Sequence, residues 1–319
     1  MARTAEVRVD DLNHLYGTRL GWDPSWFDLE PDEWDLVDGR IREFQRKFPD
    51  LKDDGICGPA TYARLIVART AADLTQVPPS ESKGNPSDTI VVGGEHRGIL
   101  WPDVMTFDEE GGLVVTGGKS TRPRKGLGAV IHWPVTYTPQ QTIVALNRRN
   151  VGTHFEIGPP MGNDGKVTIY QYADVEHHTW HAKGCNSFVG IDISSPVYAR
   201  KAVMDKCARL GMAKRPVIRG CTINGWKAPP IMGYHENQVR ALAALLGALN
   251  RHAGVALAAP GSTGNYKRLR RVSSRDEITD GVYHHAEVDF LKRGKWDTAG
   301  LDLPAVVEAA KGATPWGEA

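Results

Sequence analysis

The pattern of apolar and polar positions divides the chain into three parts. Near the N-terminus, Ile41, Phe44 and Phe48 recur at the spacing of one helix face. Further on, this periodicity is lost in a stretch that gathers Pro, Ser and Gly, which is the composition of a linker. Beyond it, short β-prone runs alternate with longer helical runs. The sequence therefore predicts a helical domain over residues 1–73, a linker over residues 74–90 and a larger domain over residues 91–319.

The N-terminal part is predicted to be a small bundle of short helices. A first helix covers Gly39 to Phe48. Asp54-Gly55 then marks a turn, because glycine accepts the backbone angles that tight turns need. Pro59 suits the first turn of a further helix, which continues through Leu65. No cluster of catalytic residue types lies in this part of the sequence.

The larger part alternates strands with helices, which predicts an α/β fold with a mixed central sheet and flanking helices. Asn163-Asp164-Gly165 supplies a hairpin-type turn before one of the strands. The predicted strands are residues 111–116, 128–132, 152–157, 166–172 and 188–193. The predicted helices are residues 139–149, 196–210, 236–253 and 303–311, and the third has a clear apolar stripe.

Composition and charge remove several classes of function. The 39 Lys and Arg residues are balanced by 38 Asp and Glu residues, so no net field marks the chain as a nucleic-acid binder. No apolar run approaches about eighteen residues, so we expect no membrane insertion. The N-terminus lacks the apolar core of a secretory signal, so we expect synthesis in the cytoplasm without a signal peptide. We also expect a monomer.

The four cysteines are Cys57, Cys185, Cys207 and Cys221, and they form neither a CxxC pair nor a dense framework. We interpret them as reduced thiols, with a Cys185–Cys221 bridge as the open alternative. The cysteine pattern therefore predicts no disulfide scaffold.

The candidate chemistry lies mainly near the C-terminus. His285, Lys295 and Asp297 stand within thirteen residues of each other, and His132 ends a short apolar run far upstream. Two histidines and a carboxylate suffice to hold a zinc ion with one coordination position open to water. His284 competes with His285 for the same role, and the spacing to the following glutamate favours His285. The sequence therefore predicts a Zn²⁺ site formed by His132, His285 and Asp297.

The residues around such a site predict hydrolysis of an amide. Water on zinc has a pKa of about 7, so hydroxide is available at neutral pH. Lys295 would place a positive charge beside the oxyanion that forms. Asp192, at the end of a predicted strand, would carry a proton to the departing amine, and Glu176 is the alternative carrier.

A second group of histidines, His177, His178 and His181, follows an HHxxH pattern that another metal ion could use. We favour a place for His181 in a substrate cleft, with His177 and His178 in an exposed loop. Trp180 has two open interpretations, as part of that cleft or as part of the core.

Within residues 40–68, several residue types recur at fixed spacing: Phe44-Gln45, Leu51, Asp54-Gly55-Ile56, Gly58-Pro59, Thr61 and Leu65. This pattern resembles the second half of the peptidoglycan-binding domain type 1 family. The resemblance implies that the N-terminal domain binds bacterial peptidoglycan.

The larger domain carries a longer series of motifs in a fixed order. They are Val130-Ile131-His132, Thr153-His154-Phe155, residues 164–167, residues 180–184, Asn186-Ser187, residues 189–192, residues 236–238, residues 285–288 and Lys295-x-Asp297. Over residues 128–302 this series resembles the zinc-dependent N-acetylmuramoyl-L-alanine amidases of type 2, a group that includes peptidoglycan recognition proteins. The resemblance implies the fold of these amidases and one Zn²⁺ ion.

The same resemblance implies a role for each candidate residue. Zinc would be held by His132, His285 and Asp297. The reacting groups would be handled by Lys295 and Asp192. The candidates for the substrate cleft are His181, Trp180 and Thr153. The chain also departs from the family pattern. Asp192 is shorter than the glutamate of many members, and Thr153 stands where some members carry a tyrosine.

The function that these observations predict is cleavage of the amide between N-acetylmuramic acid and L-alanine in the bacterial cell wall. A cell-wall hydrolase without a signal peptide indicates a phage endolysin, with a virion-associated lysin or an exported effector as alternatives. Two other functions stay open. One is a peptidoglycan-recognition protein without activity, and the other is a zinc peptidase that cuts within the stem peptide.

Overall fold

The computed structural model describes residues 8–20, 22–27, 29–30, 32–48, 51–58, 61–62, 64–65, 68, 89–261, 267–292 and 294–312. The chain forms two compact units that divide after residue 66. Within the described residues, none of the helices combines the length and the apolar composition that a membrane crossing needs.

In the smaller unit, two buried amide side chains hold a loop against two helices. The unit contains α1 (Val9–Leu20), the 3-10 turn η1 (Pro24–Phe27) and α2 (Val37–Gln45). The Gln45 amide donates to the Ile56 carbonyl (3.1 Å) and accepts from the Gly55 N–H (2.9 Å). Asn13 donates to the Gly55 carbonyl (2.8 Å) and accepts from the Cys57 N–H (2.9 Å). The motif residues around Gly55 are therefore fixed by hydrogen bonds, and Gly55 itself has a φ of 73° that favours glycine.

The predicted helix over residues 39–48 corresponds to α2, which begins two residues earlier and ends at Gln45. Residues 61–62 and 64–65 are helical, as the sequence pattern predicts. Pro59 lies outside the described residues.

The larger unit is built on a six-stranded mixed sheet with the strand order β15-β5-β9-β6-β7-β3. Its strands are β3 (Val104–Met105), β5 (Ala129–His132), β6 (Phe155–Ile157), β7 (Ile169–Gln171), β9 (Val189–Ile193) and β15 (Val282–His284). The strands from β15 to β6 run parallel, and β7 pairs antiparallel with β6. The predicted α/β fold with a mixed central sheet is confirmed.

Side-chain alternation separates the two faces of the central strands. The register pairs His132 with Asp192 and Asp192 with Glu156, so these three side chains share one face. Ile131 and Ile191 belong to the other face and are fully buried. Polar side chains therefore lie on one face of these central strands, and apolar side chains lie on the other face.

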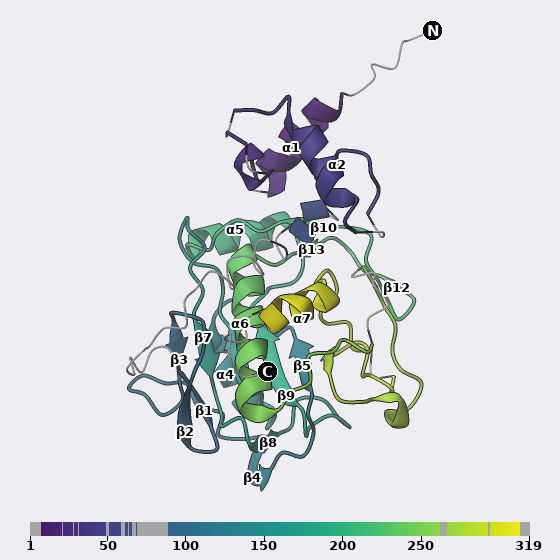
Figure 1. The fold of residues 1–319 in the computed structure, drawn as a ribbon. Coiled ribbons are helices and arrows are strands. Elements are labelled where there is room, and N and C mark those ends of the chain that lie inside the picture. The colour runs from purple at the N-terminus through teal and green to yellow at the C-terminus, as the bar shows by residue number, and fades with distance from the viewer. Residues whose placement is uncertain are drawn as a thin grey trace. The chain divides into compact units, whose positions relative to one another are not determined.

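Helices cover this sheet. α6 (Glu236–Ala253) and α7 (Leu303–Gly312) pack against each other, and they contact β6 and β15 respectively (Figure 1). On the face that carries Glu156, α4 (Pro139–Arg148) packs through Ile143 against Tyr172. The remaining long helix is α5 (Lys201–Arg209).

Most predicted elements are present with shifted ends. The helices correspond to α4, α5, α6 and α7, and four of the five strands correspond to β5, β6, β7 and β9. The predicted strand over residues 111–116 is wrong. This segment begins with a turn in which the Gly112 N–H donates to the Glu109 carbonyl (2.9 Å), and it then joins no ladder. Helix α5 begins at Lys201 rather than at residue 196, because Val197 has a φ of 67°, which no helix tolerates.

The end of the predicted linker also needs correction. Thr89 and Ile90 belong to β1 (Thr89–Val92), which pairs with β2 (Glu95–Gly98) in a tight hairpin. Ile90 and Val91 are buried, so the larger unit begins earlier than the apolar pattern suggested. Residues 74–88 of the predicted linker lie outside the described residues. All four cysteines are buried free thiols, without a Cys185–Cys221 bridge.

Candidate metal centre

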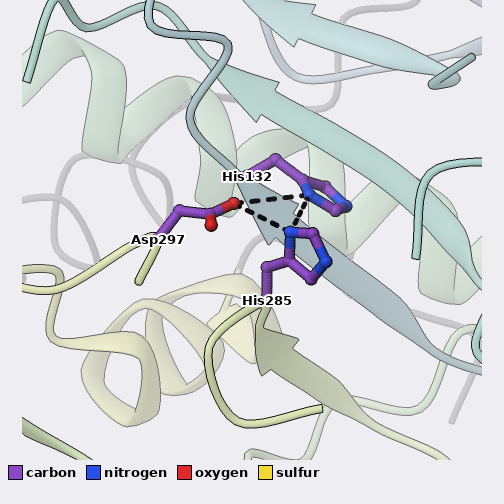
Figure 2. A group of neighbouring side chains, drawn as sticks. All are labelled: His132, His285 and Asp297. Carbon is purple, nitrogen blue, oxygen red and sulfur yellow. Dashed lines mark hydrogen bonds and ion pairs between the residues drawn. The ribbon is translucent and has the colours of Figure 1, made fainter. Parts of the chain in front are cut away.

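Three side chains from distant parts of the chain meet at the end of β5 (Figure 2). His132 is the last residue of β5, His285 directly follows β15, and Asp297 comes from the loop beyond it. The His132 Nδ1 lies 2.9 Å from the His285 Nδ1, and the Asp297 Oδ2 lies 3.0 Å from His285 Nδ1 and 3.5 Å from His132 Nδ1. Across the part of the chain that the structure describes, this is the one group of potential ligands gathered closely enough for a metal ion.

The geometry of this group fits a small cation. Zinc bonds of about 2.0–2.2 Å in a tetrahedron hold neighbouring ligand atoms roughly 3.3 Å apart. The observed separations of 2.9, 3.0 and 3.5 Å lie on both sides of that value. Two nitrogen donors and one carboxylate oxygen also leave a fourth position for water or substrate.

The electrostatics of the group favour the protonation states that metal ligands need. Burial, together with the neighbouring His285, lowers the pKa of His132 to about 4 against the opposing effect of Asp297. Burial raises the pKa of Asp297, but His285 and His132 outweigh it and hold that pKa well below its usual value. At neutral pH the centre therefore offers a neutral His132 imidazole and an ionised Asp297.

His284 points away from the centre. Its Nδ1 lies 2.7 Å from the Thr298 hydroxyl, and its backbone N–H donates to Glu287 (3.0 Å). Burial lowers the pKa of His284 to about 3. The structure thus places His285, rather than His284, beside His132 and Asp297.

His181 stands behind His132 and contacts it through a ring nitrogen. The His132 Nε2 lies 2.9 Å from the His181 Nδ1, and the His181 Nε2 lies 2.9 Å from the Phe188 carbonyl. Because a carbonyl only accepts, the His181 Nε2 carries the proton and its Nδ1 accepts from His132. His132 is then protonated at Nε2, which leaves its Nδ1 free to face the cluster.

Gly190 on β9 makes room for this arrangement. A Cβ at position 190 would lie 2.7 Å from the Thr153 hydroxyl oxygen and 2.8 Å from the His181 ring. Both distances are too short for a side chain to fit. The close approach of His181 and Thr153 to the strand therefore depends on a glycine there.

All eight predicted site residues line one cleft of about 650 Å³: His132, Thr153, Trp180, His181, Asp192, His285, Lys295 and Asp297. Trp180 is 43% exposed, so it belongs to the cleft rim rather than to the core. The loop that carries Lys295 is anchored, since its backbone N–H donates to Asp289 (2.9 Å). The alternative proton carrier, Glu176, is exposed and does not line the cleft.

Asp192 is the buried carboxyl nearest in register to His132. Burial raises its pKa well above the usual value, and the neighbouring carboxyls of Glu156 and Asp297 raise it further. Glu156 is itself fully buried beside the hydroxyls of Tyr172 (2.5 Å) and Ser194, and burial raises its pKa as well. Burial and these two carboxyls therefore favour the protonated form of Asp192 beside the candidate centre.

Sequence reasoning missed several residues of the cleft. Trp133 and Trp296 both line it, and each is a chain neighbour of a candidate ligand, which is the signal that could have found them. Arg149 lines it from the end of α4, and no motif marks that residue. Glu156 lies beside Asp192 rather than in the cleft, and it became visible only through the parallel pairing of β6 with β9.

The HHxxH group does not form a second metal site. His177 and His178, expected in an exposed loop, lie half-buried in β8 (His177–Thr179), which pairs with β4 (Lys119–Pro123). The prediction of an exposed loop is wrong because this segment forms a strand by pairing with β4. His154 lies nearby as a structural residue, accepting from the Gly190 N–H (2.9 Å) and donating to the His177 carbonyl (2.8 Å).

No protein-family model and no curated protein matches the chain. Among solved structures, the hydrolase AmiA of Staphylococcus aureus is similar over 68% of this chain and 89% of its own, at 13% identity and a TM-score of 0.35. AmpDH3 of Pseudomonas aeruginosa, solved with anhydromuramic pentapeptide, is similar over 59% of this chain and 60% of its own, at 16% identity and a TM-score of 0.35. The N-acetylmuramoyl-L-alanine amidase LysC of Clostridium intestinale is similar over 59% of this chain and 85% of its own, at 17% identity and a TM-score of 0.29. At such identities and scores, function has to be inferred from the residues of the site.

Proposed function

We propose that this protein is a zinc-dependent peptidoglycan hydrolase that cleaves the amide between N-acetylmuramic acid and L-alanine. The observation that carries the proposal is the His132–His285–Asp297 group at the base of a cleft. A buried carboxyl at Asp192 and an amine at Lys295 line the same cleft. The ordered motifs of the larger domain add the substrate class, since they resemble type 2 amidases.

His132, His285 and Asp297 would hold the zinc ion. When bound, zinc supplies Lewis acidity and makes hydroxide available near neutral pH. Lys295 would stabilise the negative charge that develops on the carbonyl oxygen of the scissile amide. Asp192 would give a proton to the nitrogen of the departing L-alanine, for which its raised pKa suits it.

The cleft walls would position the substrate. Trp180 and Thr153 line the cleft, so both can contact the bound chain. Both ring nitrogens of His181 are engaged by His132 and Phe188, which leaves its ring carbons for any contact with substrate. The cleft, rather than a single residue, would therefore select the substrate.

The N-terminal unit would act as a peptidoglycan-binding domain, because its Gln45 and Gly55 network falls on the residues of that family's motif. Tethering the catalytic domain to its polymer raises the local substrate concentration without changing the site. We propose that the protein acts on the cell wall as a phage endolysin, working as a monomer.

The proposal is tested with purified cell walls and full-length protein. The expected product is a new L-alanine N-terminus, identified by mass spectrometry, and metal removal should abolish its release until zinc is restored. His285→Ala should lose the activity, whereas His96→Ala, at an exposed histidine outside the cleft, should keep it. A metal-independent rate would overturn the zinc assignment, and N-termini other than L-alanine would indicate a peptidase. Binding to cell walls without any product would indicate a recognition protein.

A further inference from the structure

A row of four aromatic rings in mutual contact begins in the candidate cleft and continues beyond it. Trp133 and Trp296 line the cleft, and their ring centroids lie 5.5 Å apart. The Trp296 ring lies 5.5 Å from Tyr198 at an angle of 15°, and 6.1 Å from Trp226 at an angle of 73°. We call these four residues the aromatic wall. It leads from the metal centre to the molecular surface, where Trp226 is 46% exposed.

The opposite side of the cleft has a different chemistry. Arg149 and Lys183 are exposed and line it. Lys183 and Asn186 line the cleft shortly before β9 begins in the chain, and Asp192 lines it from β9 itself, so the basic side is next to β9. Trp296 precedes the ligand Asp297, so the aromatic wall is next to β15. Because β5 lies between β15 and β9, the metal centre separates the two sides.

The aromatic wall is held in place by hydrogen bonds from its supporting hairpin. Trp226 lies on β12 (Trp226–Lys227), which pairs with β11 (Thr222–Ile223) across the turn Asn224-Gly225. The Asn224 side chain donates to the Ala286 carbonyl (3.0 Å). Ala286 in turn donates its N–H to the Asp297 carbonyl (2.6 Å). The exposed tryptophan is thus connected to the loop that carries the candidate ligand.

A fixed row of indole rings that is partly exposed suits a sugar chain. Tryptophan and tyrosine offer large rigid contact areas at a low cost in conformational entropy. The C–H face of a pyranose ring is apolar and its rim is polar, so it can lie on an indole face while its hydroxyl groups stay solvated. Lys227 and Arg200 are exposed beside Trp226 and Tyr198 and can contact that rim. The stem peptide would then lie on the other side of the metal centre, where Arg149 and Lys183 line the cleft and can pair with its carboxylates.

We propose that the aromatic wall is a binding subsite for the glycan strand of peptidoglycan. The inference deepens the proposed amidase function, and it also orients the substrate, with sugars on the β15 side of the metal centre and peptide on the β9 side. Occupancy extends outward from the scissile bond, first over Trp296 and then over Trp226.

The test uses the full-length chain and a peptide-free tetrasaccharide of alternating N-acetylglucosamine and N-acetylmuramic acid. Binding is followed through the indole N–H signals of Trp226 and Trp296 in NMR titrations, which report on the wall separately from any binding by the N-terminal unit. Trp226→Ala should weaken binding to the wall roughly tenfold, as truncation of an aromatic anchor does. Trp226→Tyr should restore most of it.

Met161→Ala is the matched control, because Met161 is a similarly exposed apolar side chain (41%) that lies outside both the cleft and the aromatic wall. It should leave the tetrasaccharide affinity unchanged. If the sugar shifts neither indole signal, or if Trp226→Ala binds as the parent protein does, the glycan subsite is wrong even when the enzyme is an active amidase. Sugar binding at the wall in a protein that hydrolyses nothing would uphold the subsite and reject the amidase.

Discussion

His181 fixes the orientation of His132 through a hydrogen bond of 2.9 Å between the His181 Nδ1 and the His132 Nε2. The Phe188 carbonyl holds the other nitrogen of His181, so the proton positions along this chain of groups are determined. The consequence is that His132 turns an unprotonated Nδ1 toward His285 and Asp297. A partner of this kind orients a metal-ligating histidine and selects its tautomer.

Replacing His181 should therefore weaken metal binding. We expect His181→Ala to lower the zinc affinity about 10- to 100-fold, because His132 loses the partner that orients it. The measurement is competition with a chromophoric chelator on the full-length protein. His178→Ala is the control, because His178 is half-buried on β8 and does not line the cleft. Equal affinities for the two variants would show that His132 is held by packing alone.

The two adjacent histidines should behave differently when each is removed. His285→Ala should abolish stoichiometric zinc binding, since it deletes one of three ligand atoms. His284→Ala should still bind one zinc ion but lose roughly 1–3 kcal/mol in the free energy of unfolding, because the buried Thr298 hydroxyl loses its partner. Metal content by mass spectrometry and urea unfolding measure the two effects. Zinc retained in the first variant and lost in the second would reverse the assignment.

Asp192 should be needed for turnover and not for metal binding. We expect Asp192→Asn to lower kcat about 10²- to 10⁴-fold, the range that general acid–base catalysis contributes, while zinc content stays at one per chain. Glu176→Gln should keep nearly the parent rate, because Glu176 is exposed and lies outside the cleft. Product release from cell walls measures both rates. A larger loss in the Glu176 variant would identify that residue as the proton carrier.

Acid should destabilise the larger unit partly through His154. Burial lowers the pKa of His154 to about 3, against 6.5 for a free histidine, so the unfolded chain binds more protons between these values. The contribution of His154 to the free energy of unfolding is therefore fully present above about pH 6.5. It falls by about 1.4 kcal/mol for each pH unit below that value. Between pH 6.5 and pH 5, the free energy of unfolding of His154→Gln should fall by about 2 kcal/mol less than that of the parent protein.

This difference is measured by urea unfolding at several pH values, with a near-ultraviolet dichroism signal from the larger unit. His96→Gln serves as the control at an exposed histidine and should follow the parent curve. Parallel curves for the parent and the His154 variant would mean that His154 is already protonated in the folded protein.

The sequence pattern predicts those elements whose ends and faces depend on neighbouring residues in the chain. Helix α6 has its predicted ends because His235 caps it, Gln238 completes a capping box and Gly254 terminates it in the left-handed region. Strand β9 could be predicted because it is a short run rich in β-branched apolar residues, and the structure buries all of its positions. Strands of two residues, such as β12, were missed because they are too short to show a period.

Local patterns and motifs predict the fold class, the main helices and strands, and the set of residues from which a metal centre can be built. Tertiary structure decided which of these residues meet, because ligand distances, ring tautomers and cleft walls depend on contacts between segments far apart in the chain. His285 rather than His284 faces His132, and Glu156 lies beside Asp192 only through the strand register. The edge-to-face contact of Trp226 with Trp296 likewise joins positions that no local pattern connects.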